Sequence, residues 1–144
     1  MKRFNAVPHI RLGPVKIGAT RAEVRDVMGA PENTFKKSAA SAQPTDAWFQ
    51  SAFQVFYTPV GTVEFIEVSG NAGIEVICFG EAVFSTAAAT LVARLGKTTA
   101  LISSDGGHTF IAHEIDVALW RPEVDAPEDT HFATFGLGRL GYYA

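Results

Sequence analysis

Histidines are the residues of this sequence that come closest to a catalytic or metal-binding set. His108 and His113 lie five residues apart in a segment that we expect to be extended, where an odd spacing places their side chains on opposite faces. His9 and His131 are remote from them in the sequence, and the chain has neither an H-E-x-x-H nor a C-x-x-C motif. We therefore predict no metal site, and His108 or His113 stays as the acid–base residue of an alternative, enzymatic interpretation.

Two glycine-containing segments resemble phosphate-binding motifs but lack the required context. Residues 136–141 match G-x-G-x-x-G, yet only three residues follow Gly141, so no helix N-terminus is available to receive a pyrophosphate. Residues 96–98 match the end of a phosphate loop, but Leu91 stands where its first glycine should be. The sequence also lacks a G-x-S-x-G nucleophile motif. We therefore expect no catalytic residue, no cofactor and no enzymatic activity.

Aromatic residues next to polar or charged ones are the feature most typical of a binding surface. Trp, Tyr and Arg dominate binding hot spots because they combine a large contact area with hydrogen-bonding groups. The alternative is that both tryptophans are half-buried core residues. We interpret six residues as a partner-binding set: Trp48, Phe49, Trp120, Arg121, Tyr142 and Tyr143.

The bulk composition limits the classes of partner and compartment. With 144 residues, 47% hydrophobic and 19% charged, the chain is expected to fold as a single domain over residues 1–144. A net charge of −3, with no basic run longer than Lys36-Lys37, argues against nucleic acid as a partner. Cys78 is the only cysteine, which favours a reducing compartment. No signal peptide and no run of ~20 apolar residues is present, so we expect a cytoplasmic protein that binds no membrane.

Two segments show helical spacing of apolar residues. Thr20 and Glu23 form a capping box at the start of the first, and Gly29 is expected to end it. The second covers residues 86–95 and is closed by Gly96. The two helix ends lie 67 residues apart and each is followed by a loop and strands. That spacing predicts an internal helix-then-strands duplication, with repeats at 10–80 and 81–144.

Extended segments account for most of the remaining chain. The short turns between residues 53 and 79 predict an antiparallel meander, and residues 33–45 are expected to form a loop or a mobile edge. Two helices packed on an antiparallel β-sheet give an α+β fold class. The expected strands cover residues 10–12, 15–17, 53–58, 62–69, 74–79, 99–103, 108–115, 117–121, 131–135 and 140–143.

The first helical segment also carries a family resemblance. Residues 18–31, GATRAEVRDVMGAP, resemble the G-x-T-x-x-E-V-x-x-x-x-G-x-P helix of the β-lactamase-inhibitor-protein-like superfamily, which includes small outer-membrane assembly lipoproteins. Segments of this character also occur in small cytosolic bacterial proteins, some of them immunity proteins. The chain has no lipid-modified N-terminal cysteine and no cysteine pair. The resemblance therefore implies the fold and not the lipoprotein role.

These observations together lead to one expected function and two alternatives. We expect a non-enzymatic protein-binding domain of inhibitor or immunity type, of bacterial origin, whose negative charge favours a basic partner. The first alternative is a small-molecule-binding domain or minor enzyme with a phenylalanine-lined pocket. The second is a structural subunit that oligomerises through its edge strands.

Overall fold

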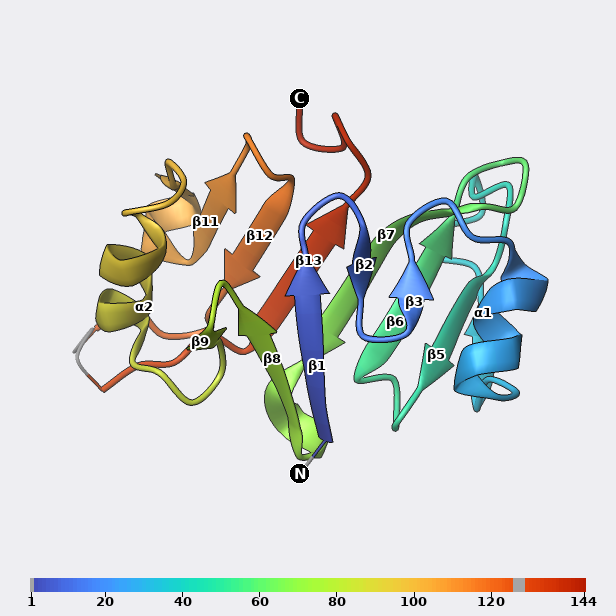
Figure 1. The fold of residues 1–144 in the computed structure, drawn as a ribbon, viewed down its shortest axis with the longest axis horizontal. Helices are drawn as coiled ribbons and strands as arrows, with labels where there is room; N and C mark the ends of the chain where they lie inside the picture. Colours follow the sequence, from blue (N-terminus) through green and yellow to red (C-terminus); the bar gives the residue numbers. More distant parts are fainter. Residues whose placement is uncertain (1, 126–128) are drawn as a thin grey trace.

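The computed structural model describes residues 2–125 and 129–144, and in this part of the chain β-structure dominates (Figure 1). An eight-stranded antiparallel sheet has the strand order β10-β11-β12-β13-β7-β6-β5-β4, and a five-stranded sheet has the order β3-β2-β1-β8-β9. Figure 1 shows the small sheet in front of the central strands of the large one, with a helix at each flank. The elements are β1 (Lys2–Val7), β2 (Arg11–Leu12), β3 (Val15–Lys16), α1 (Arg21–Met28), β4 (Asn33–Phe35), β5 (Thr45–Trp48), β6 (Phe53–Tyr57), β7 (Val63–Ser69), β8 (Ile74–Cys78), β9 (Glu81–Ala82), α2 (Ala88–Leu95), β10 (Ile102–Ser104), β11 (Thr109–Ala112), β12 (Val117–Trp120) and β13 (Thr134–Gly138).

The predicted α+β class, with two helices on one antiparallel sheet, is wrong. The described residues form thirteen strands in two sheets, with 40% of residues in strands and 16% in helices. Each α-helix has only eight residues. Several strands could not be predicted from the sequence. β4 and β9 are too short to show alternation of apolar and polar residues. All four residues of β5 are buried, so this strand shows no alternation either.

The predicted meander of residues 53–79 holds only for its first two strands. β6 and β7 pair antiparallel, but the chain then turns through Gly70–Ala72 and Gly73, and β8 enters the small sheet. There β8 pairs in parallel with β1, in a register that places Glu75 opposite Arg3. Parallel pairing of segments far apart in the chain leaves no local signal in the sequence.

The capping box at the start of α1 is confirmed. Thr20 Oγ1 accepts a hydrogen bond from the Glu23 amide at 3.2 Å, and Glu23 Oε1 accepts one from the Thr20 amide at 3.0 Å. Gly29 ends the helix with a φ of 83°. α1 precedes the four strands β4 to β7, and α2 precedes the four strands β10 to β13.

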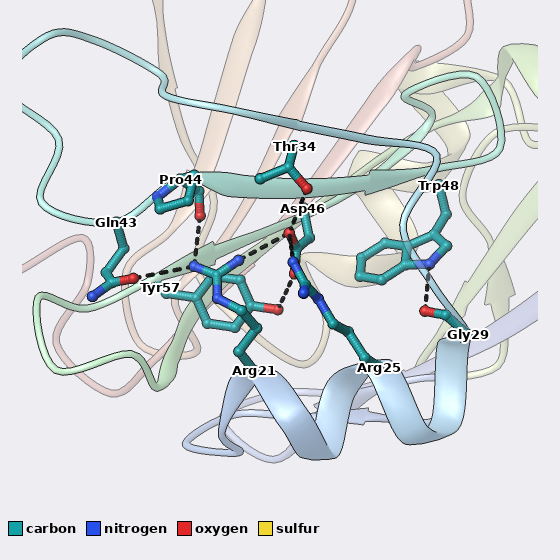
Figure 2. A network of polar contacts seen from close by, with 9 residues as sticks. All are labelled: Arg21, Arg25, Gly29, Thr34, Gln43, Pro44, Asp46, Trp48 and Tyr57. Atoms are coloured by element: carbon teal, nitrogen blue, oxygen red, sulfur yellow. Dashed lines mark hydrogen bonds and ion pairs between the residues drawn. The ribbon is translucent and has the colours of Figure 1, made fainter.

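A buried carboxylate fixes α1 to the large sheet (Figure 2). Asp46 on β5 is fully buried and accepts two hydrogen bonds from Arg25, at 2.9 and 3.1 Å. Thr34 and Tyr57 each donate a further hydrogen bond at 3.0 Å. Arg21 Nη1 lies 2.9 Å from Asp46 Oδ1, as an ion pair outside hydrogen-bond geometry. Burial alone would raise the pKa of Asp46, but these donors and the two positive charges lower it.

The hydrophobic core lies between the two sheets. Leu12 and Val76 of the small sheet belong to the same buried cluster as Ile66 and Phe135 of the large sheet. The opposite face of the large sheet, here called the outer face, is not covered by the small sheet. Side chains of this outer face include those of Gln54, Glu67 and Ala118, which share one row of the strand register with Gly136.

Candidate binding site

A hollow on the outer face arises from one transverse row of residues. In this row Gln54 lies opposite Glu67, Glu67 opposite Gly136, and Gly136 opposite Ala118. Because glycine has no side chain and alanine has only a methyl group, the surface falls away beside Glu67. The resulting Glu67 hollow has a volume of about 390 Å³. Its lining residues are Lys37, Phe65, Glu67, Thr109, Ala118, Leu119, Trp120, Thr134, Gly136, Tyr142 and Tyr143.

Aromatic rings form one wall of the Glu67 hollow. Tyr142 stacks on Phe65 with ring centroids 4.6 Å apart and an interplanar angle of 9°. Tyr143 meets both rings edge-on, at 6.1 Å from Phe65 and 5.1 Å from Tyr142. A side chain at position 136 would place its Cβ 2.5 Å from the Phe65 ring, so this packing requires Gly136. Trp120, whose residue surface is 41% exposed, also lines the hollow. It lies opposite Thr134 at one end of β13, whereas Phe65 lies opposite Gly138 at the other end.

The C-terminal segment that carries the two tyrosines is held by Asp116. This buried carboxylate accepts hydrogen bonds from the amides of Gly141 at 2.9 Å and Tyr143 at 2.8 Å. His9 donates a third through Nε2 at 2.8 Å, and His113 Nδ1 donates to the Tyr143 carbonyl oxygen at 2.7 Å. Burial would raise the pKa of Asp116, but these donors lower it. The tyrosine wall is therefore anchored on both sides of residue 142.

Glu67 itself has a very different environment. Its side chain is half-buried, and among the described residues it forms neither a hydrogen bond nor an ion pair. Burial raises its pKa, and the charge of Lys37 offsets only part of that increase. Burial, followed by nearby negative charges, also raises the pKa of Tyr142 and Tyr143, so both phenols stay neutral at ordinary pH. The hollow therefore combines aromatic walls, neutral hydroxyls and one unpaired carboxyl.

A second hollow continues the first across the outer face. It has a volume of about 210 Å³ and shares Lys37 and Tyr142 with the Glu67 hollow. Gln43 and Pro59 contribute to its far side. Lys37 lies between the two hollows with its Nζ 4.9 Å from the ring centroid of Phe56. The two hollows adjoin at Lys37 and Tyr142, and we refer to them together as the groove.

Of the six residues predicted to bind a partner, three converge on the Glu67 hollow. Trp120, Tyr142 and Tyr143 all line it. Trp48 lies elsewhere, only 3% exposed, and its Nε1 donates to the Gly29 carbonyl at 3.1 Å. Phe49 packs beside the core, against Phe4 of β1. Trp48 therefore corresponds to the core alternative, whereas Trp120 is open to a partner.

Arg121 and the two histidines of the enzymatic alternative make local structural contacts. Arg121 is 8% exposed and donates to the Gly107 carbonyl and to Thr130 Oγ1, both at 3.0 Å. His108 Nδ1 donates to the Arg121 carbonyl at 2.9 Å. His113 is engaged with the backbone of Tyr143 and, like His108, does not line either hollow of the groove.

Sequence reasoning missed Glu67 and Lys37. The two-residue spacing of Phe65 and Glu67 does signal a shared strand face. A register shift beside Phe56 and Tyr57 disturbs the simple alternation, so that Val63 joins the core while Phe65 faces outward. Lys37 lies in the segment expected to be a loop, and no pattern in the sequence places it over Phe56.

The described residues contain neither a candidate metal cluster nor a membrane-spanning helix. No group of three or more His, Cys, Asp or Glu side chains in residues 2–125 and 129–144 could hold a metal ion. Neither helix in this part of the chain has the length and apolar character needed to cross a membrane.

No protein-family model, curated protein or solved structure matches the chain. The proposal for its function therefore rests on the geometry of the groove.

Proposed function

We propose that the chain is a non-catalytic protein-binding domain whose recognition surface is the groove on the outer face of the large sheet. The observation that carries this proposal is the convergence of Trp120, Tyr142 and Tyr143 around the unpaired carboxyl of Glu67. Exposed Trp and Tyr side chains around a recess are the usual anchors of protein interfaces. Fixed aromatic side chains also lose little conformational entropy when a partner binds.

The shape of the groove favours a macromolecular partner over a small molecule. Small-molecule pockets enclose most of the surface of their ligand, whereas the two adjoining hollows lie open on a sheet face. The net charge of −3 favours a basic partner surface through long-range attraction. If the partner is an enzyme whose active site the groove covers, the domain is an inhibitor.

Affinity purification with matched variants tests this proposal. The tagged wild type, Trp120→Ala and Val60→Ala are each used to capture partners from a lysate of the native cells, with a salt wash. Val60 is 85% exposed and does not line the groove, so its variant controls for handling and folding. We expect one stoichiometric partner with the wild type and Val60→Ala, and its loss with Trp120→Ala. Inhibition is then measured on the purified partner.

Three other outcomes would contradict the proposal. Equal capture by Trp120→Ala would show that the partner binds outside the groove. A rise in melting temperature with a small metabolite, lost in Trp120→Ala, would support the small-molecule alternative. A mass that increases with protein concentration would support the oligomerising subunit, whose exposed edge strands are β4 and β10.

A further inference from the structure

Half-buried Glu67 differs from the fully buried carboxylates of the described chain, because it has no hydrogen-bond partner among the described residues. Asp46, Glu75 and Asp116 are the buried carboxylates of the described chain, and each accepts at least three hydrogen bonds. Buried polar groups in folded proteins are almost always satisfied in this way. Glu67 accepts none from the described residues, although it lies in a recess walled by aromatic rings. The Glu67 carboxyl is half-buried and still reaches solvent, so it remains open to a donor from outside the chain.

The surroundings of Glu67 favour a positively charged donor. The faces of Trp and Tyr rings attract cations, and a carboxylate in a partly desolvated recess gains more from a cation than one in open water. Burial raises the pKa of Glu67, a change that a bound cation would reverse. The neighbouring phenols of Tyr142 and Tyr143 are neutral and therefore do not compete as charges.

The chain already places one ammonium group on this face. Lys37 Nζ lies 4.9 Å from the ring centroid of Phe56, and it forms no ion pair with Glu67. The part of the groove next to Lys37 thus holds a cation against an aromatic ring. The part beside Trp120 offers a comparable ring and, in addition, a free carboxyl.

The recess is also pre-organised. The hydrogen bonds from Gly141 and Tyr143 to Asp116 fix the backbone on either side of Tyr142. The stack of Tyr142 on Phe65 fixes the ring itself. Binding of a ligand in the Glu67 hollow therefore costs little conformational entropy for ordering the tyrosine wall.

We propose that the Glu67 hollow receives a lysine or arginine side chain of the partner protein, whose charged head pairs with Glu67 and whose aliphatic stem packs between Trp120 and the tyrosine wall. This inference rests on the proposed function, and it specifies the chemistry of the partner. The second hollow, which adjoins the first at Lys37 and Tyr142, offers space for the residues that flank the basic side chain. This neighbouring space favours a side chain carried on a polypeptide over a free amine.

Blocked tripeptides provide a direct test that does not require the partner. Acetyl-Gly-Arg-Gly-amide and its lysine analogue are titrated into the isotope-labelled full chain, with the norleucine analogue as the uncharged control. We expect saturable NMR shifts at the Gly136 amide and the Trp120 indole with the basic peptides only. Glu67→Gln should weaken the binding about tenfold, because it removes a charge-assisted hydrogen bond. Lys37→Gln should strengthen it about twofold by removing a repulsive charge.

Glu81→Gln is the matched control, since it removes the same charge from β9 of the small sheet, where Glu81 pairs with Arg94 at 3.1 Å. Its affinity should stay within about twofold of the wild type. Equal binding of the norleucine peptide, unchanged binding by Glu67→Gln, or no binding of the basic peptides would each overturn this inference. Equal capture of the partner by the wild type and Trp120→Ala in the purification would instead contradict the proposed function, so the two failures are distinguishable.

Discussion

Asp46 and Glu67 are carboxylates on opposite faces of the same sheet. They differ in burial, in ion pairing and in hydrogen bonding. Asp46 is fully buried on the inner face and is paired with Arg21 and Arg25 and hydrogen-bonded by neutral donors. Glu67 is half-buried on the outer face and unpaired within the described chain. Their pKa values accordingly move in opposite directions, down for Asp46 and up for Glu67.

This difference separates a structural charge from one available to a partner. A buried charge contributes to stability only when its donors are supplied by the same chain, as they are for Asp46. A partly buried charge without donors from its own chain is less well solvated than a free one, and a bound cation can recover that cost. The comparison therefore predicts opposite effects on stability when either carboxylate is neutralised.

The largest expected effect is at Asp46. Asp46→Asn removes the negative charge between Arg21 and Arg25, and we expect the free energy of unfolding in urea to fall by about 3 kcal/mol. Asp26→Asn on the exposed side of α1 is the control and should stay within about 0.5 kcal/mol of the wild type. A fall of less than about 1 kcal/mol for Asp46→Asn would show that the cluster does not anchor α1.

Asp116 is the second comparison, because it holds the wall of the groove instead of a helix. Asp116→Asn tolerates the left-handed conformation found there, with φ of 53°, but it loses the charge that attracts His9 and two backbone amides. We expect a loss of about 2 kcal/mol in stability and faster hydrogen exchange at Gly141 and Tyr143. Unchanged exchange at these amides would mean that other contacts hold the segment.

The stability contributions of Asp46 and Asp116 should share one pH dependence. Both carboxyls have a pKa lowered by folding, so both contributions are complete above the unfolded value of about 3.9 and are lost as pH falls through the folded values. Urea unfolding from pH 7 down to pH 2 should show the difference between wild type and each Asn variant shrinking below about pH 4. A difference that grows on acidification would contradict the assigned direction of the pKa shifts.

Gly136 gives a smaller effect that concerns the hollow itself. Gly136→Ala would place a methyl 2.5 Å from the Phe65 ring, which is already stacked against Tyr142. We expect a loss of about 1–2 kcal/mol, together with weaker binding of the basic tripeptides. Combining it with Phe65→Val should restore part of the stability. A neutral Gly136→Ala would show that the tyrosine wall yields easily and is not pre-organised.

How far the sequence predicts these regions depends on the distance over which each signal acts. The capping box of Thr20 and Glu23 and the stop at Gly29 lie within one helix, and local pattern was enough to predict them. The hollow depends on Glu67 lying opposite Gly136, which is 69 residues further along the chain. Neither residue has a local pattern that reveals the pairing of β7 with β13. The parallel pairing of β1 with β8 was missed for the same reason.

For the candidate site, the chemistry of the residue types was a better guide than the positions predicted for them. Trp120, Tyr142 and Tyr143 were selected for their chemistry, and the fold brings them together. Trp48 was selected on the same basis, yet it lies on the inner face with its indole bonded to Gly29. Strand parity could separate the two tryptophans only if the boundaries of β5 and β12 were known, and β5 shows no alternation.

The smallest expected effect, at Glu67, tests the comparison most directly because its sign is reversed. Folding raises the pKa of Glu67, so as pH rises above about 4 the unfolded carboxyl ionises first and the wild type loses stability. Glu67→Gln should therefore be more stable than the wild type by up to about 1 kcal/mol at pH 7, since partial solvation limits the penalty, and equal to it at pH 3.

Urea unfolding at the two pH values measures this difference, with Glu81→Gln as the control that should show no gain. A less stable Glu67→Gln would mean that the Glu67 carboxyl is already stabilised by a partner in the folded chain. A saturating basic tripeptide should then act selectively, because the cation relieves the penalty that only the wild type carries. It should raise the unfolding free energy of the wild type more than that of Glu67→Gln, which reduces the gap between them at pH 7.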